Sequence, residues 1–133
     1  MKRTFWFIYL ALVLATPAIA LSTEDEVESF TVEIRSRMFI PQHVHLHHDR
    51  KTVLRFRSHD TELHTVVAKE LFLSADLNVG GNGAPEFGPN GLKRVIIPAE
   101  GLIEFQFTPA HTGTFSYLCD MPGHNMQAVI VVE

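Results

Sequence analysis

The sequence has almost no cysteine and no excess of basic residues. Cys119 is the single cysteine among 133 residues, which excludes an intrachain disulfide and a zinc site built on several cysteines. Eleven lysines and arginines stand against fifteen aspartates and glutamates, a net charge of −4. This balance argues against a protein that binds nucleic acid or an anionic membrane through a polybasic surface. The sequence also lacks internal repeats and low-complexity tracts.

The longest apolar run lies at the N-terminus and is short for a membrane span. A basic start precedes the apolar residues 5–15, and an Ala-x-Ala sequence follows at residues 18–20, a pattern typical of secretory signal peptides. We therefore predict a signal peptide over residues 1–20, with an uncleaved N-terminal anchor as the alternative. Cleavage leaves nine basic and fifteen acidic residues, a net charge of −6. It places the mature protein outside the cytoplasm, most simply in a bacterial periplasm.

After a short acidic segment at residues 21–29, the sequence favours β-strands. Apolar and polar residues alternate with a period of two in several stretches, and the chain ends in an apolar run. These stretches are residues 30–35, 43–47, 54–57, 103–107, 115–119 and 129–132. Turn-forming sequences separate them, and no long helical pattern is present. We predict one all-β domain over residues 30–133, an antiparallel sandwich or barrel of about seven to eight strands.

One region departs from the strand pattern. Apolar residues at 71, 72, 75 and 77 predict a short helix within residues 68–78. The glycine-rich residues 80–85 that follow predict a flexible loop. We therefore expect one short insertion of helix and loop in an otherwise β-rich domain.

The residues with the most distinctive chemistry lie between Gly113 and Val132. A strand is expected to end at Cys119, a tight Pro122-Gly123 turn then presents His124, and Met126 follows before the next strand. A thiolate, an imidazole and a thioether in one short loop are ligands that suit copper. A trigonal site of two histidines and one cysteine with a weak axial methionine is the geometry of electron-transfer copper proteins. Such a site needs one more histidine from elsewhere in the chain.

His64 is the best candidate for this second histidine. It follows a strand and the turn at residues 58–60, and it begins the run His64-Thr65-Val66-Val67, where a histidine can point into one end of a sandwich. Each proposed ligand has a plainer alternative. These are His59 in place of His64, a buried structural thiol at Cys119, a solvated turn residue at His124, and core packing at Met126 with Gln127 or a backbone oxygen in its place.

These features resemble the cupredoxins, the plastocyanin and azurin type of small blue copper protein. The resemblance covers about residues 30–133. It rests on Phe39-Ile40-Pro41 after the first strand, on His64, on the Gly-x-Phe-x-Tyr-x-Cys sequence that ends at Cys119, and on the Cys-x4-His spacing with Pro-Gly before the histidine. It implies a Greek-key β-sandwich that holds one copper ion, which cycles between Cu(I) and Cu(II).

The resemblance also implies the ligand set. His64, Cys119 and His124 correspond to the equatorial ligands, and Met126 corresponds to the axial one. Two features depart from the family pattern: Met126 follows the loop histidine more closely than in azurin-like relatives, and Thr65 stands where an asparagine usually follows the first histidine. A threonine hydroxyl can take the place of the asparagine as a hydrogen-bonding group near the copper thiolate.

A cluster of histidines at positions 43, 45, 47 and 48 is not explained by the family pattern. Strand alternation predicts His43, His45 and His47 on one face, with neighbours about 6.5–7 Å apart. Three interpretations stay open: a solvated strand face, a second and weaker copper or zinc site, or a docking face that responds to pH.

The resemblance implies a periplasmic electron carrier rather than an enzyme. We expect a monomer that does not bind nucleic acid, has no membrane segment in its mature form, and meets a redox partner with a basic patch, such as a cytochrome or an oxidase. The alternative is a copper-trafficking or copper-resistance protein that uses the same site together with the histidine-rich strand. A mononuclear copper oxidase or reductase would need an open coordination position, and the single cysteine excludes a binuclear copper domain with a two-cysteine loop.

Overall fold

The computed structural model describes residues 14–20 and 26–133. Residues 14–20 have no regular secondary structure. The rest of the predicted signal peptide, residues 1–13, and most of the predicted acidic segment lie outside the described residues. Within these two ranges, no helix has the length and hydrophobicity to traverse a bilayer.

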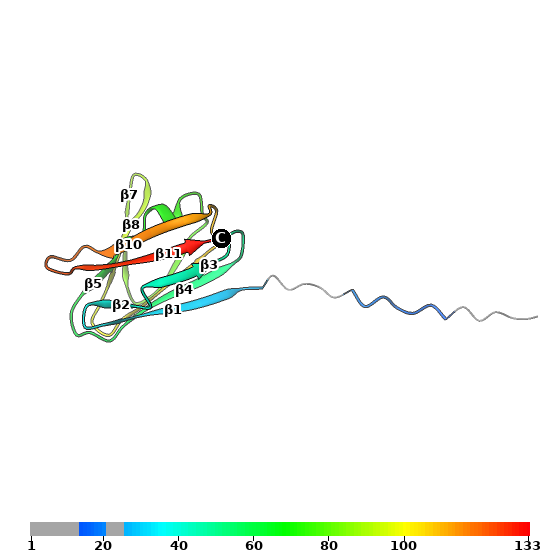
Figure 1. Cartoon of the computed structure of the whole chain (residues 1–133), viewed down its shortest axis with the longest axis horizontal. Coiled ribbons are helices and arrows are strands. Elements are labelled where there is room, and N and C mark those ends of the chain that lie inside the picture. Colours follow the sequence, from blue (N-terminus) through cyan, green and yellow to red (C-terminus); the bar gives the residue numbers. More distant parts are fainter. Residues whose placement is uncertain (1–13, 21–25) are drawn as a thin grey trace, which may run out of the picture.

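The domain is built from strands in two layers (Figure 1). The described residues form eleven strands and a single turn of 3₁₀ helix at Glu70–Phe72. The strands are β1 (Glu28–Arg35), β2 (Met38–Ile40), β3 (His43–Leu46), β4 (Thr52–Ser58), β5 (His64–Val66), β6 (Asn78–Gly81), β7 (Ala84–Gly88), β8 (Gly91–Ile97), β9 (Leu102–Phe107), β10 (Gly113–Cys119) and β11 (Met126–Val132).

One layer is a five-stranded sheet with the order β2-β1-β4-β9-β6, and the other layer combines two three-stranded sheets, β10-β11-β3 and β5-β8-β7. Val67, directly after β5, pairs with Leu118 of β10 through two backbone hydrogen bonds of 2.9 and 3.2 Å. This bridge joins the two smaller sheets side by side. The predicted all-β Greek-key sandwich is confirmed, and the sheets do not close into a barrel.

The strand count and two pairings differ from the prediction. Eleven strands form in the described residues instead of seven to eight, and β1 pairs with β4, and β3 with β11, in parallel. The parallel pairing of β1 and β4 arises because the chain passes through β2 and then β3, in the other layer, before it returns. A strictly antiparallel sandwich was therefore the wrong expectation.

The predicted insertion also differs from the structure. The helix expected within residues 68–78 shrinks to one turn, and residues 80–85 belong largely to β6 and β7 rather than to a flexible loop. Pairing of β6 with the distant β9, and of β7 with β8 in the hairpin that follows, imposes this order on a glycine-rich segment. Gly81 suits its place because φ is +93° there, and an added Cβ would lie 2.1 Å from the carbonyl oxygen of Leu102.

The core lies between the layers and contains a cluster of four aromatic rings. Tyr117 of β10 packs against Phe39 and Phe56, with ring centroids 4.8 and 5.4 Å apart, and Phe56 packs against Phe105 at 5.9 Å. All four side chains are buried. Because side chains on a strand alternate between its faces, fixing Tyr117 in the core also turns Cys119, two residues later, inward.

We expect the Tyr117→Phe variant to be as stable as the wild type, or more stable by about 1 kcal/mol in urea unfolding. The Tyr117 hydroxyl is buried, it has no hydrogen-bond partner among the described residues, and burial raises its pKa. The variant removes this unpaired polar group and keeps the ring. A matched Phe56→Ala variant, which leaves a cavity, should lose about 3–5 kcal/mol. A marked loss of stability in Tyr117→Phe would contradict the assignment of an unpaired hydroxyl.

Candidate metal centre

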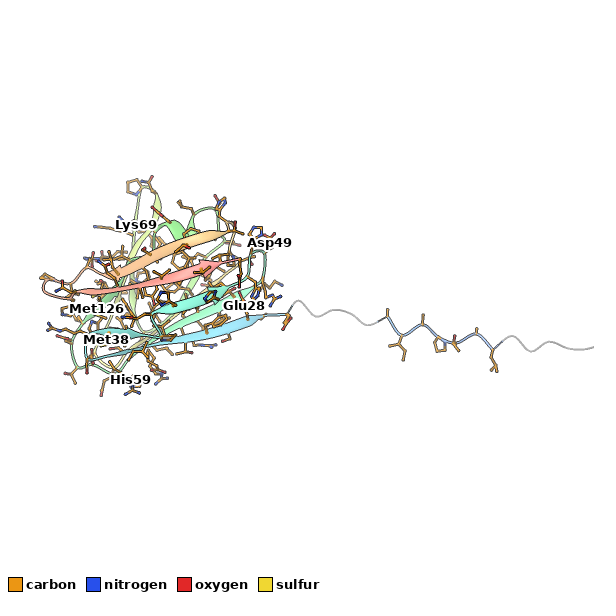
Figure 2. The ribbon with its side chains drawn as sticks, in the orientation of Figure 1. Glu28, Met38, Asp49, His59, Lys69 and Met126 are labelled. Carbon is orange, nitrogen blue, oxygen red and sulfur yellow. The ribbon has the colours of Figure 1, made fainter. Side chains whose placement is uncertain are left out.

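The four predicted ligands come from strand ends and one loop at the same end of the sandwich. His64 is the first residue of β5, Cys119 is the last residue of β10, His124 lies in the β10–β11 loop, and Met126 begins β11. Figure 1 shows this loop at the end of the molecule where β2 and β5 lie. Figure 2 shows Met126 at this end, away from Glu28 and Asp49. Residues far apart in the sequence are thus brought to one place.

Three of these residues converge on a common point. The potential ligand atoms of His64, Cys119 and His124 lie within 4.8 Å of one another. The Cys119 Sγ lies 3.6 Å from Nδ1 of His124 and 4.0 Å from Nδ1 of His64. His64 and Cys119 are buried, and the His124 side chain is 6 % exposed. Two imidazole nitrogens therefore face a thiol sulfur in a site that water reaches poorly.

The Pro-Gly turn predicted before His124 is present. The backbone N–H of His124 donates to the carbonyl oxygen of Met121 at 3.0 Å, which closes a four-residue turn. Pro122 suits the second position of such a turn, and Gly123 supplies the left-handed φ of +78° that the third position needs. The local sequence thus explains how the histidine is carried back toward Cys119.

Met126 shares a strand face with Cys119. The two residues are directly opposite in the antiparallel pairing of β10 and β11, so their side chains point to the same side of the sheet. Met126 is buried. This placement agrees with an axial position, and its role as a ligand stays a prediction.

Thr65 lies behind the thiol and connects it to the loop. Its backbone N–H donates to the Cys119 Sγ at 3.4 Å. Its hydroxyl oxygen accepts the N–H of Asp120 at 2.8 Å and lies 2.6 Å from the Asp120 carboxylate, to which it donates, whereas the sulfur is 3.6 Å away. Arg94 of β8 pairs with the same carboxylate at 3.1 Å. The predicted hydroxyl contact is therefore directed mainly at Asp120, and the backbone N–H is the stronger donor to the sulfur.

The outer nitrogens of both histidines face carboxylates that our sequence analysis missed. Nε2 of His64 lies 2.9 Å from Asp60 Oδ2, and Nε2 of His124 lies 3.6 Å from Glu62 Oε2. Burial raises the pKa of Asp60, but hydrogen bonds from the backbone N–H groups of Arg37 and Ser36 and from His64 hold it below its usual value. Asp60 and Glu62 lie four and two residues before His64 in the sequence, and this short spacing could have indicated that they lie near the site.

The histidine-rich segment does not gather into a comparable group. His43 and His45 are exposed on β3, as alternation predicts, and the His45 Nδ1 lies 3.8 Å from a carboxylate oxygen of the C-terminal Glu133. His47 follows directly after the end of β3 and is exposed as well, and its Nδ1 lies 2.7 Å from a Glu28 carboxylate oxygen.

His48 is also engaged elsewhere. Its Nε2 lies 3.1 Å from the carbonyl oxygen of Ala110, and its Nδ1 lies 3.1 Å from Asp49. Residues 14–20 and 26–133 contain no group of three potential metal ligands that includes any histidine of this cluster. His59, the alternative to His64, pairs with Glu33 and lies outside the three-residue group.

Comparisons with known proteins identify the fold. The chain matches the cupredoxin-like domain family over residues 4–132. Auracyanin A, a "blue" copper protein from the green thermophilic photosynthetic bacterium Chloroflexus aurantiacus, is 16 % identical, with a TM-score of 0.60 over 81 % of this chain and 100 % of that chain. A reduced Cu(I) form of an amicyanin mutant at pH 4 is 18 % identical, with a TM-score of 0.52 over 79 % of this chain and 82 % of that chain.

No curated protein matches the chain. At these identities the two solved structures establish a shared fold, whereas the family match extends over nearly the whole sequence. The resemblance inferred from the residues is therefore confirmed, and the chain belongs to the cupredoxin-like family.

Proposed function

We propose that this protein carries single electrons with one copper ion, held by the four residues that the sequence singles out. These are His64, Cys119, His124 and Met126. The observation that carries the proposal is the convergence of two imidazole nitrogens on a buried thiol. Membership of the cupredoxin-like family and the likeness to two solved copper proteins support copper as the metal.

The donor set itself favours copper over zinc. Zinc sites in proteins use thiolate, imidazole and carboxylate ligands, whereas a thioether such as that of Met126 suits copper. Nδ1 of each histidine faces the sulfur, and each Nε2 faces a carboxylate. A proton on Nε2 leaves the lone pair of Nδ1 free to bind a metal. When bound, the copper ion supplies a one-electron Cu(I)/Cu(II) couple.

The scaffold around the site suits electron transfer because it holds the ligands in place. His64 and Cys119 lie on strands that the Val67–Leu118 bridge joins, and the aromatic core fixes β10 from the other side. The backbone N–H of Thr65 stabilises negative charge on the sulfur. Ligands that keep their positions in both oxidation states allow electron transfer with little rearrangement.

We further propose the setting in which the carrier works. It is exported by a cleaved signal peptide over residues 1–20 and acts in the periplasm as a monomeric domain of residues 30–133. Its net charge of −6 after cleavage favours a redox partner with a basic patch, such as a cytochrome or an oxidase. Four protein ligands leave no coordination position open for a substrate, which favours a carrier over an enzyme. Copper trafficking by the same site together with the histidine-rich strand is the alternative, and it predicts further copper binding by His43 and His45, the two histidines of the cluster that lie on β3.

Addition of one equivalent of Cu(II) to the mature protein should give an intense absorption band in the red, because a thiolate transfers charge to copper. Cys119→Ser should abolish the band. His59→Ala, which changes a histidine outside the site, should keep it. A colourless product from the wild type would contradict the proposed site, and binding of a second copper ion that His43→Ala and His45→Ala remove would favour trafficking.

Met126→Leu should keep the red band and raise the reduction potential, because it removes a weak donor that stabilises Cu(II). Met126→Gln should lower the potential, because an amide oxygen is a harder donor that favours Cu(II). Protein-film voltammetry measures both shifts, with Met121→Leu as a control on the methionine in the loop that precedes β11. Equal potentials in the wild type and both Met126 variants would exclude Met126 as the axial ligand. Gln127→Ala would then test the alternative.

A further inference from the structure

The loop between β4 and β5 supplies a carboxylate to the outer nitrogen of each proposed copper histidine. Asp60 Oδ2 lies 2.9 Å from Nε2 of His64, and Glu62 Oε2 lies 3.6 Å from Nε2 of His124. The side chains of His64 and His124 are 0 % and 6 % exposed. Both carboxylates therefore contact imidazole rings that are shielded from water, and screening is weakest at the Asp60–His64 contact, where both side chains are largely buried.

Arg37, in the turn between β1 and β2, holds both carboxylates. Its guanidinium donates to the two oxygens of Glu62 at 2.6 and 2.8 Å. Its backbone N–H donates to Asp60 Oδ2 at 3.0 Å, and that of Ser36 donates to Asp60 Oδ1 at 2.8 Å. Ser36 and Arg37 have φ values of 50° and 58°, so this turn takes up a left-handed backbone to aim both N–H groups at one side chain. Asp60 is thus fixed by contacts that do not involve a metal.

The two carboxylates differ in how strongly they act on the histidines. His64 is fully buried, its partner Asp60 is 16 % exposed, and their contact has hydrogen-bond length. Glu62 is 38 % exposed, lies farther from His124, and is partly neutralised by Arg37. A carboxylate can only accept, so the proton of the neutral His64 ring belongs on Nε2. Nδ1 is then left with its lone pair directed toward the Cys119 sulfur.

We propose that Asp60 is the positioning residue that fixes the ring of His64, and that Asp60 and Glu62 together favour Cu(II) over Cu(I) and so lower the reduction potential. This inference rests on the proposed function. A carboxylate bound to the outer nitrogen raises the basicity of a histidine ligand, and a nearby negative charge stabilises the ion of higher charge. Asp60 has the larger effect because its contact is shorter and less exposed.

The first test needs no copper. Nitrogen-15 NMR of the metal-free mature protein at neutral pH should find His64 protonated on Nε2, with a ring proton that exchanges slowly because the ring is buried. Asp60→Ala should remove this slow exchange. A wild-type His64 protonated on Nδ1 would overturn the positioning role of Asp60, whatever the protein does with copper.

The second test measures the potential of the copper-loaded protein. Asp60→Asn keeps an acceptor oxygen, so the variant should keep the red absorption band. The affinity of the variant for Cu(II) should fall about tenfold relative to its affinity for Cu(I). This ratio corresponds to a rise in potential of about 59 mV. Glu62→Gln should shift the potential in the same direction by less, and Asp60→Ala should weaken Cu(II) binding more than Asp60→Asn does.

Glu33→Gln is the matched control, because Glu33 is the carboxylate partner of His59, a histidine outside the site. Potentials of the Asp60 and Glu62 variants equal to that of Glu33→Gln would overturn the inference. If Asp60→Asn fails to fold, the potential of Glu62→Gln decides whether these carboxylates favour Cu(II). Glu62 contacts only the side chains of Arg37 and His124 among the contacts described above, so its replacement disturbs no backbone hydrogen bond described here. Absence of the red band in the wild type would instead contradict the proposed function, and the NMR result would still decide the role of Asp60.

Discussion

The geometry of the metal centre depends on the pairing of the strand that carries His64 with the strand that ends in Cys119. The bridge between Val67 and Leu118 joins these strands, although His64 and Cys119, two of the proposed ligands, are 55 residues apart in the sequence. Bringing such distant residues together costs chain entropy, which the sandwich core offsets by burying apolar side chains from both layers. The site is therefore a product of the whole fold, and no single segment of the chain could form it.

The two buried polar residues that begin β5 both have hydrogen-bond partners. His64 and Thr65 are both fully buried, which is costly unless their polar atoms form hydrogen bonds. The ring of His64 bonds to Asp60, and the hydroxyl of Thr65 bonds to Asp120, which in turn pairs with Arg94. These contacts extend from the two small sheets to the turn between β1 and β2, so the site is braced by both layers.

Sequence reasoning identified the parts of the site that local chemistry defines. The Pro122-Gly123 turn dictates how His124 approaches Cys119, and strand alternation dictates that Cys119 faces inward. The carboxylates of Asp60 and Glu62 escaped notice because their roles depend on Arg37, which only the fold brings near. Residues 80–85 were expected to form a loop partly for the same reason, because β6 is ordered by pairing with β9, a strand that begins more than 20 residues later.

The residues of the site are held in place in two different ways. The antiparallel register of β10 and β11 sets Cys119 opposite Met126. Strand pairing fixes the positions of these two residues, and β5 fixes His64, whereas His124 depends on the conformation of the few residues between the two strands. Insertions or deletions between Asp120 and His124 would therefore act mainly on one imidazole, while strand pairing keeps Cys119 and Met126 in place. Such a division gives evolution a means to diversify the centre through a single hairpin while the sandwich stays unchanged.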